Sequence, residues 1–160
     1  MLHDYPIREA IPADIPFLVS FQLAMALETE NLSLDPVILQ KGIEAVFANP
    51  SRGRYYVTTF GDRPVASLLI TPEWSDWRNA WVWWIQSVWV EPHFRNKNLY
   101  ANMYRHLKEE VMHKPGLRGL RLYVDKSNQN AIRVYEHLGM DGSHYALFEW
   151  MPEANDTTRE

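Results

Sequence analysis

Residues 128–140, Asn-Gln-Asn-Ala-Ile-Arg-Val-Tyr-Glu-His-Leu-Gly-Met, carry the strongest local pattern in the chain. Asn128 follows the apolar run 120–124, and its short side chain can accept a hydrogen bond from the first amides of a helix. Gly139 can end that helix because glycine takes a left-handed conformation at little cost. Four residues recur at helical spacing, namely Ala131, Val134, Tyr135 and Leu138. The stretch therefore predicts a capped helix with one buried apolar face.

The tyrosine of this helix has two interpretations. A tyrosine on an apolar helix face is commonly a core aromatic whose hydroxyl has a partner. The pattern Asn-x-x-Ala-x-x-x-Tyr-Glu-x-x-Gly-Met after a strand, however, resembles a motif of the GCN5-related N-acetyltransferases, the GNAT superfamily. The resemblance implies that Asn128 and Ala131 lie against the pantetheine arm of coenzyme A. It also implies that Tyr135 is the general acid that protonates the departing thiolate.

Length and composition indicate one folded domain. The chain has 160 residues and is 46% hydrophobic, which is enough to bury a core without covalent staples. We expect a single domain over residues 1–151 and a polar tail over 152–160. The chain has no cysteine, which excludes a disulfide framework, a thiolate zinc site and a cysteine nucleophile.

Charge and hydropathy exclude two classes of partner. The net charge is -4 and no block of like charge stands out, so we expect no nucleic-acid partner. The first residues are acidic where a signal peptide needs a basic start, and no apolar run has membrane-spanning length. We therefore expect a cytoplasmic protein with no membrane partner.

The order of predicted elements is β-α-α-β-β-β-α-β-α-β. The segments, in chain order, are 5–10, 12–27, 36–47 with Asp35 as cap, 54–60, 65–71, 80–90, 98–113, 117–124, the helix from 128, and 143–150. A polar break is expected at 28–31 and turns at 61–64 and 74–79. This order is that of the GNAT fold, an α/β (α+β) architecture. It implies a mixed, central twisted sheet of six to seven strands flanked by about four helices, with the ligand at the carboxyl ends of the strands.

The predicted cofactor loop departs from the family. In the superfamily the long strand leads into Arg/Gln-x-x-Gly-x-Gly/Ala, whose backbone amides and helix dipole hold the CoA pyrophosphate. Here Asn98 and Tyr100 occupy the two glycine positions. Asparagine enters the left-handed region at modest cost, whereas the phenol narrows or reshapes the site. The alternative is an ordinary solvated loop. The resemblance assigns acetyl-CoA to Val88, Trp89, Val90, Arg95, Asn96, Lys97, Asn98, Leu99 and Tyr100.

The implied reaction is direct attack of a neutral amine on the thioester, without a covalent enzyme intermediate. Amides around residues 88–90 would polarise the carbonyl. The long strand offers only Gln86 and Ser87 where many relatives place a base. Glu28 and Glu30 are therefore the first candidate bases, ahead of Glu73 and Asp76, although each is also consistent with a solvated surface carboxylate.

The acceptor is predicted to be a small-molecule or peptide amine. Five of the seven tryptophans fall between residues 74 and 84, a density that is typical of a core or of an interface, so a homodimer is also considered. Aromatic faces beside carboxylates also suit a cationic amine with an apolar body. The predicted acceptor pocket comprises Glu73, Trp74, Asp76, Trp77, Trp84 and Gln86. The six histidines show no metal-ligand spacing, so no metal is predicted.

Two other functions compete with N-acetyl transfer. The missing loop glycines and the absent strand base fit a degenerate GNAT-like module that binds CoA or senses a ligand without turnover. Transfer of a different acyl group, such as succinyl, would use the same residues. The sequence does not separate these alternatives.

Overall fold

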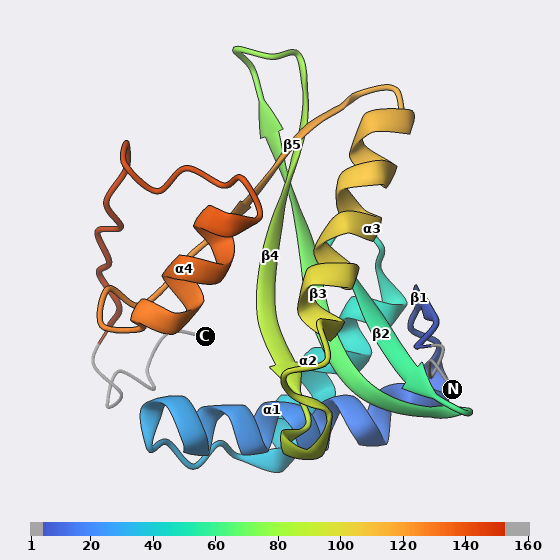
Figure 1. Ribbon diagram of the computed structural model, residues 1–160. Coiled ribbons are helices and arrows are strands. Elements are labelled where there is room, and N and C mark those ends of the chain that lie inside the picture. Colours follow the sequence, from blue (N-terminus) through green and yellow to red (C-terminus); the bar gives the residue numbers. More distant parts are fainter. Residues whose placement is uncertain (1–4, 153–160) are drawn as a thin grey trace. The chain divides into compact units, whose positions relative to one another are not determined.

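The computed structural model describes residues 5–152, and the chain forms two compact units, Met1–Leu122 and Tyr123–Glu160 (Figure 1). The first unit contains β1 (Ile7–Glu9), α1 (Ile15–Glu30), α2 (Pro36–Ala48), β2 (Arg54–Phe60), β3 (Arg63–Ser75), β4 (Ala80–Val90), α3 (Leu99–His113) and β5 (Leu117–Leu122). The second contains α4 (Gln129–His137). The boundary between the units falls inside residues 1–151, which were predicted to form one domain. That these residues form a single domain stays a prediction.

The sheet of the first unit has five strands in chain order, β1-β2-β3-β4-β5. The first four pair antiparallel, and β4 pairs with β5 in parallel, so the expected mixed α/β (α+β) sheet is confirmed. Within residues 5–152 the sheet has five strands, fewer than the six to seven expected. Residues 143–150, predicted as the last strand, form no strand: 143–144 are a bend and 145–150 have no regular structure. An alternating apolar pattern does not by itself supply a pairing partner.

Helix ends follow local chemistry closely. Asp35 caps α2 as predicted, its Oδ1 accepting from the amides of Val37 and Ile38 at 2.8 and 3.2 Å. The predicted helix 12–27 is a 3-10 turn at Pro12–Asp14 followed by α1, which continues to Glu30. Glu28 and Glu30 therefore lie on α1 and not in a polar break. The helix stops at Asn31, which is left-handed at φ 50°.

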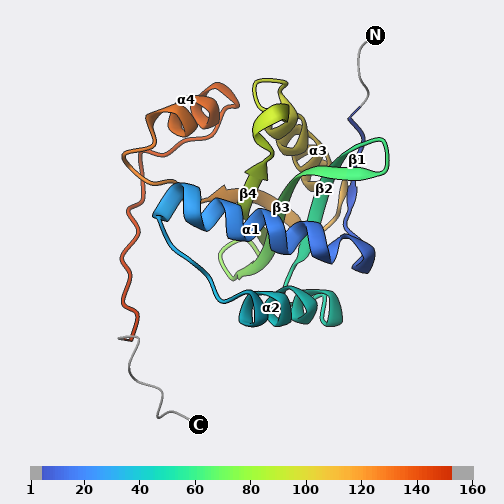
Figure 2. The ribbon, with the colours of Figure 1, turned by 90° about the horizontal axis from the view of Figure 1, so that it is seen from below.

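The core of the first unit lies on both faces of the sheet. Leu18 of α1 and Ile43 of α2 pack with Tyr55 and Val57 of β2 on one face. Tyr56 points to the other face, where its hydroxyl donates to Glu110 of α3 at 3.0 Å. Figure 2 shows α2 and α3 on opposite sides of β2 and β3. No helix within residues 5–152 has the length and apolar character needed to cross a membrane.

The second unit confirms the predicted cap and stop of α4. Asn128 Oδ1 accepts from the amide of Ala131 at 3.1 Å. Gly139 is left-handed at φ 88°, and the amides of Gly139 and Met140 donate to the carbonyls of Glu136 and Tyr135. This is the Schellman arrangement. The burial of its apolar face stays a prediction.

Candidate functional site

The carboxyl end of β4 contains a β-bulge. Ser67 of β3 pairs with Trp89 and Leu69 pairs with Gln86, so two β4 residues, Ser87 and Val88, lie opposite the single residue between them. Ser87 has φ 53°, a left-handed conformation that is uncommon for serine. The bulge changes the direction of the backbone just before residues 88–90. The resemblance implies that amides of these residues polarise the thioester carbonyl.

The strand also loses its parallel neighbour here. The pairing of β4 with β5 ends at Ile85 and Leu122, whereas β4 continues to Val90. Within the described first unit, residues 86–90 therefore pair with β3 alone. The two parallel strands therefore separate at this point. The role of Val88, Trp89 and Val90 in holding a thioester stays a prediction.

The loop after β4 leads into a helix N-terminus through two left-handed asparagines. Asn96 and Asn98 both have φ 60°, which confirms that Asn98 can take the conformation expected of glycine. Leu99 begins α3 and is buried, while Tyr100 is half-buried on the first turn. The first amides of a helix lack intrahelical acceptors and carry a partial positive charge, so this end of α3 suits an anion.

Arg95 is held by three groups. Its Nε donates to the carbonyl of Val90 at 3.0 Å, and its guanidinium lies 4.9 Å from the ring centre of Trp89. Its two terminal nitrogens lie 2.9 and 3.1 Å from the two carboxylate oxygens of Glu28. The arginine therefore links the end of α1 to the end of β4. Lys97, whose Nζ lies 5.1 Å from the ring centre of Phe94, is the more accessible cation of the loop.

The predicted acceptor residues divide between two faces of the sheet. Glu73 accepts from Trp84 Nε1 at 3.1 Å and from Arg121 at 2.8 Å. Gln86, on the same face by alternation, donates to Thr71. The Trp74 ring instead contacts Trp81 on the opposite face, with centroids 5.1 Å apart. The structure thus groups Glu73, Trp84 and Gln86 and separates Trp74 from them.

The other two predicted acceptor residues lie in the β3–β4 turn. Trp77 is 90% exposed, and its amide donates to Asp76 Oδ1 at 2.9 Å. Their place in the acceptor pocket stays a prediction. Sequence reasoning missed Arg121, whose guanidinium lies 5.7 Å from the centre of the Trp84 ring. Arg121 lies opposite Trp84 in the parallel pairing of β4 with β5. Predicting this contact would require the register of the two strands, which the sequence alone does not supply.

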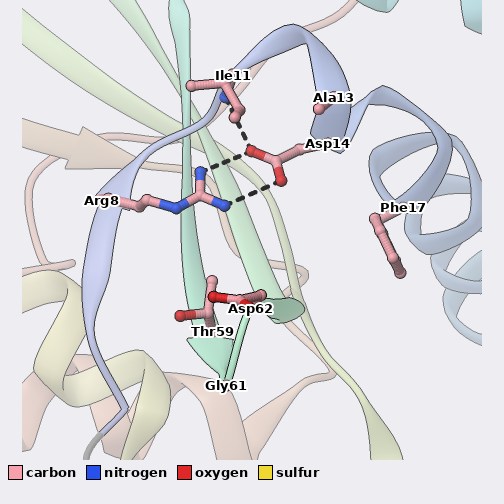
Figure 3. Close-up of a pocket in the computed structure, with 8 residues that line it drawn as sticks. All are labelled: Arg8, Ile11, Ala13, Asp14, Phe17, Thr59, Gly61 and Asp62. Carbon is pink, nitrogen blue, oxygen red and sulfur yellow. Dashed lines mark hydrogen bonds and ion pairs between the residues drawn. The ribbon is translucent and has the colours of Figure 1, made fainter.

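A cavity of about 460 Å³ lies elsewhere in the first unit (Figure 3). In it Arg8 forms two hydrogen bonds with Asp14, at 2.7 and 3.0 Å, and the amide of Ile11 donates to the same carboxylate. Burial raises the pKa of Asp14, but these bonds outweigh it, and the pKa lies below its usual range. No predicted site residue lines this cavity. The Asp14 carboxylate connects the turn before α1 to Arg8 of β1.

The remaining predicted residues belong to the second unit. Tyr135 lies on α4, and burial raises the pKa of its hydroxyl above that of a free phenol. The phenol is therefore protonated at neutral pH, as a general acid must be. Asn128 uses its side-chain oxygen for the helix cap. Within residues 5–152, no cluster of three or more metal-ligating side chains is present.

A family model and a solved structure agree on the family to which this chain is similar. The model of the acetyltransferase (GNAT) family matches residues 21–140. A possible acetyltransferase from Clostridium difficile 630 is 37% identical, with 93% of this chain and 99% of that chain covered and a TM-score of 0.87. The comparison with curated proteins gave no match.

Two further solved structures share the fold at lower identity. A transcriptional regulator from Bacillus halodurans C-125 is 22% identical over 92% of this chain and 100% of its own, with a TM-score of 0.78. Glucosamine-6-phosphate N-acetyltransferase from Arabidopsis thaliana is 19% identical over 93% and 99%, with a TM-score of 0.68.

Proposed function

The chain belongs to the acetyltransferase (GNAT) family, and from this premise we propose that it transfers an acetyl group from acetyl-CoA to an amine in the cytoplasm. The acceptor is a small molecule or a peptide amine. The observation that carries the proposal is the carboxyl end of β4, where a bulge, a strand separation and a helix N-terminus follow one another within fourteen residues, 86–99.

The loop supports binding of the donor. The amides at the start of α3 lack intrahelical acceptors and favour the pyrophosphate of acetyl-CoA. Lys97 adds an exposed positive charge. Arg95 connects the loop to Val90 and Glu28 by its hydrogen bonds and ion pair. Asn98 is left-handed, the conformation expected of the first of the family's two glycines.

The proposed reaction uses few groups of the chain. The amine nitrogen attacks the thioester carbon, and an amide of residues 88–90 donates to the carbonyl oxygen as negative charge develops on it. The carbon–sulfur bond then breaks, and the CoA thiolate takes a proton from Tyr135. The proton lost by the amine passes to a carboxylate. Glu30 is preferred over Glu28 for this step, because both oxygens of Glu28 are engaged by Arg95.

The grouping of Glu73 and Trp84 supports an acceptor with an apolar body and a cationic amine. The carboxylate attracts the ammonium group, and the indole offers a flat face beside it. Arg121 already occupies that position, so an incoming ammonium group competes with an internal cation. Such competition favours acceptors that also carry an anionic group for Arg121 to bind.

A second function is favoured by specific contacts. Tyr100 stands where the family has its second glycine, and Arg95 is engaged by Glu28. Both features fit a member that binds CoA as a ligand without turnover. Transfer of another acyl group, such as succinyl, is the third alternative.

One experiment separates these functions. Thermal shift with acetyl-CoA, succinyl-CoA and CoA measures donor binding, and thiol release over a panel of aromatic, long-chain and zwitterionic amines measures turnover. We expect stabilisation by acetyl-CoA and thiol release with at least one amine. Stabilisation without release across the panel would favour the ligand-binding function, and the absence of stabilisation by any of the three would refute both.

A further inference from the structure

One glutamine lies on the buried face of α1. The buried residues of this helix are Leu18, Phe21, Gln22 and Ala26, and Gln22 is the only one of them with a polar side chain. Because it lies one helical turn from Leu18 and one from Ala26, the glutamine occupies a position in the apolar stripe of the helix. Burial of a side-chain amide is unfavourable unless the amide forms a hydrogen bond. The partner of this amide therefore indicates what the residue does.

The partner is the left-handed residue of the β4 bulge. Gln22 Nε2 lies 3.5 Å from the carbonyl oxygen of Ser87 and donates to it. Among the described residues, this is the only hydrogen bond of the Gln22 side chain. Figure 1 shows the carboxyl end of β4 next to α1. The helix thus contacts β4 at the only residue of that strand with a positive φ.

The bond to this carbonyl also determines the direction of an amide. The Ser87 carbonyl and the Val88 amide belong to one planar trans peptide, so they point in opposite directions. Rotation of the peptide would turn both groups together. A φ of 53° is unfavourable for serine, and a hydrogen bond to the Ser87 carbonyl offsets part of that cost. A donor on α1 therefore stabilises both the bulge and the orientation of the Val88 amide.

We propose that Gln22 is a positioning residue for acetyl transfer, because it holds the peptide between Ser87 and Val88 in the orientation that directs the amides of residues 88–90 to the thioester carbonyl. This role rests on the proposed function. Gln22 acts through the backbone and not by contact with the substrate. A hydrogen-bond donor stabilises developing negative charge only when it is aimed at the oxygen that carries the charge. The same helix also carries the candidate base Glu30, so α1 serves both halves of the reaction.

The backbone of Ser87 tests the positioning without turnover. The three-bond coupling between the amide proton and the α proton of Ser87 reports its φ, and NMR measures it in the protein without donor. Gln22→Met keeps the length of the side chain and removes the hydrogen-bond donor. We expect this variant to change both the Ser87 coupling and the chemical shift of the Val88 amide. Gln40→Met, at an exposed glutamine of α2, is the control and should change neither. An unchanged Ser87 coupling in Gln22→Met would overturn the proposal.

Steady-state thiol release tests the consequence for catalysis. Gln22→Met should lower kcat by about 10- to 100-fold, because a misplaced amide stabilises the transition state less well. The KM for acetyl-CoA should stay within about threefold of the wild type, since the contacts of the pyrophosphate loop are unchanged. Leu18→Ala leaves a cavity at a buried position of the same helix and is the control for packing. It should lower the thermal midpoint and keep the wild-type kcat. An equal loss of kcat in Gln22→Met and Leu18→Ala would show that Gln22 acts only through packing.

A second substitution should rescue the first. Glycine takes a left-handed conformation at little cost, so Ser87→Gly removes the need for a bond that stabilises it. The double variant Gln22→Met with Ser87→Gly should therefore have a kcat at least about threefold above that of Gln22→Met alone. A double variant no more active than Gln22→Met would contradict the link between the bond and the left-handed backbone.

Failure of this proposal and failure of the acetyl-transfer function are distinguishable. If acetyl-CoA is neither bound nor turned over, the proposed function fails, and the Ser87 coupling still shows whether Gln22 holds the bulge. If the wild type turns over and Gln22→Met has the wild-type kcat, the function stands and the positioning role is refuted.

Discussion

Single residues in this chain take conformations that their neighbours require. Asn98 and Ser87 are both left-handed, but asparagine reaches that region readily and serine does not. The bulge at Ser87 therefore stores some backbone strain at the end of β4. Strain of this kind persists where the surrounding pairing over-determines it, and it is concentrated at functional sites.

Ser87→Val should show the cost of that conformation. A β-branched residue is strongly disfavoured at φ 53°, so the free energy of unfolding should fall by about 1–2 kcal/mol. Ser87→Gly, the matched control, removes the strain and should change it by less than about 1 kcal/mol. Urea unfolding of the three proteins measures both differences. Equal loss in the two variants would show that the serine hydroxyl matters and the backbone does not.

Tyr135→Phe should separate catalysis from donor binding. The substitution removes one hydroxyl and keeps the ring, so the KM for acetyl-CoA should stay within about threefold of the wild type. Loss of a general acid should lower kcat by about 10²-fold. Steady-state thiol release measures both constants. His137→Phe, at an exposed position of α4, is the control. Full activity of Tyr135→Phe would show that another group protonates the CoA thiolate.

Contacts between elements depend on residues that are distant in sequence. Glu110 of α3 accepts from Tyr56 of β2 and also contacts His106 and Lys114. Burial raises the pKa of Glu110, but the bonds from Lys114 and Tyr56 and the charge of His106 outweigh it, and the pKa lies below its usual range. This carboxylate therefore fastens α3 to the sheet in its ionised form.

Glu110→Gln should weaken the fold in a pH-dependent way. Because the folded-state pKa is lowered, the carboxylate contributes stability above its unfolded pKa, and that contribution is lost as the pH falls through the lower folded pKa. The variant should be about 1–3 kcal/mol less stable than the wild type at pH 7, and the difference should shrink towards pH 3. Urea unfolding at both pH values measures it. Glu109→Gln, the control, should be as stable as the wild type at both pH values. If the stability difference between Glu110→Gln and the wild type is the same at pH 7 and pH 3, ionisation of Glu110 is not its cause.

The sequence predicts elements well where the signal is local and fails where it is not. The caps at Asp35 and Asn128 and the left-handed Asn98 follow from side chains within three residues. The pair of Glu28 with Arg95 joins residues 67 positions apart, and no local pattern marks it. Residues 143–150 alternate as a strand does but form no strand, because pairing requires a partner that a local sequence pattern does not identify.

At the scale of the whole molecule, folding and donor binding are expected to be linked. The proposed donor site uses the end of β4 and the start of α3, which exist only in the folded chain. A ligand that binds the folded chain and not the unfolded chain raises the free energy of unfolding.

Acetyl-CoA should therefore raise the thermal midpoint. At a hundredfold excess over its dissociation constant, a ligand adds about 2.7 kcal/mol to the free energy of unfolding. With an unfolding entropy of about 2.1 cal/mol/K for each of the 160 residues, the midpoint should rise by about 8 °C. Differential scanning fluorimetry with and without acetyl-CoA measures the rise. Lys97→Glu should reduce the rise, because it replaces a cation of the loop with an anion. A midpoint that acetyl-CoA does not change would mean that the folded chain does not bind the donor.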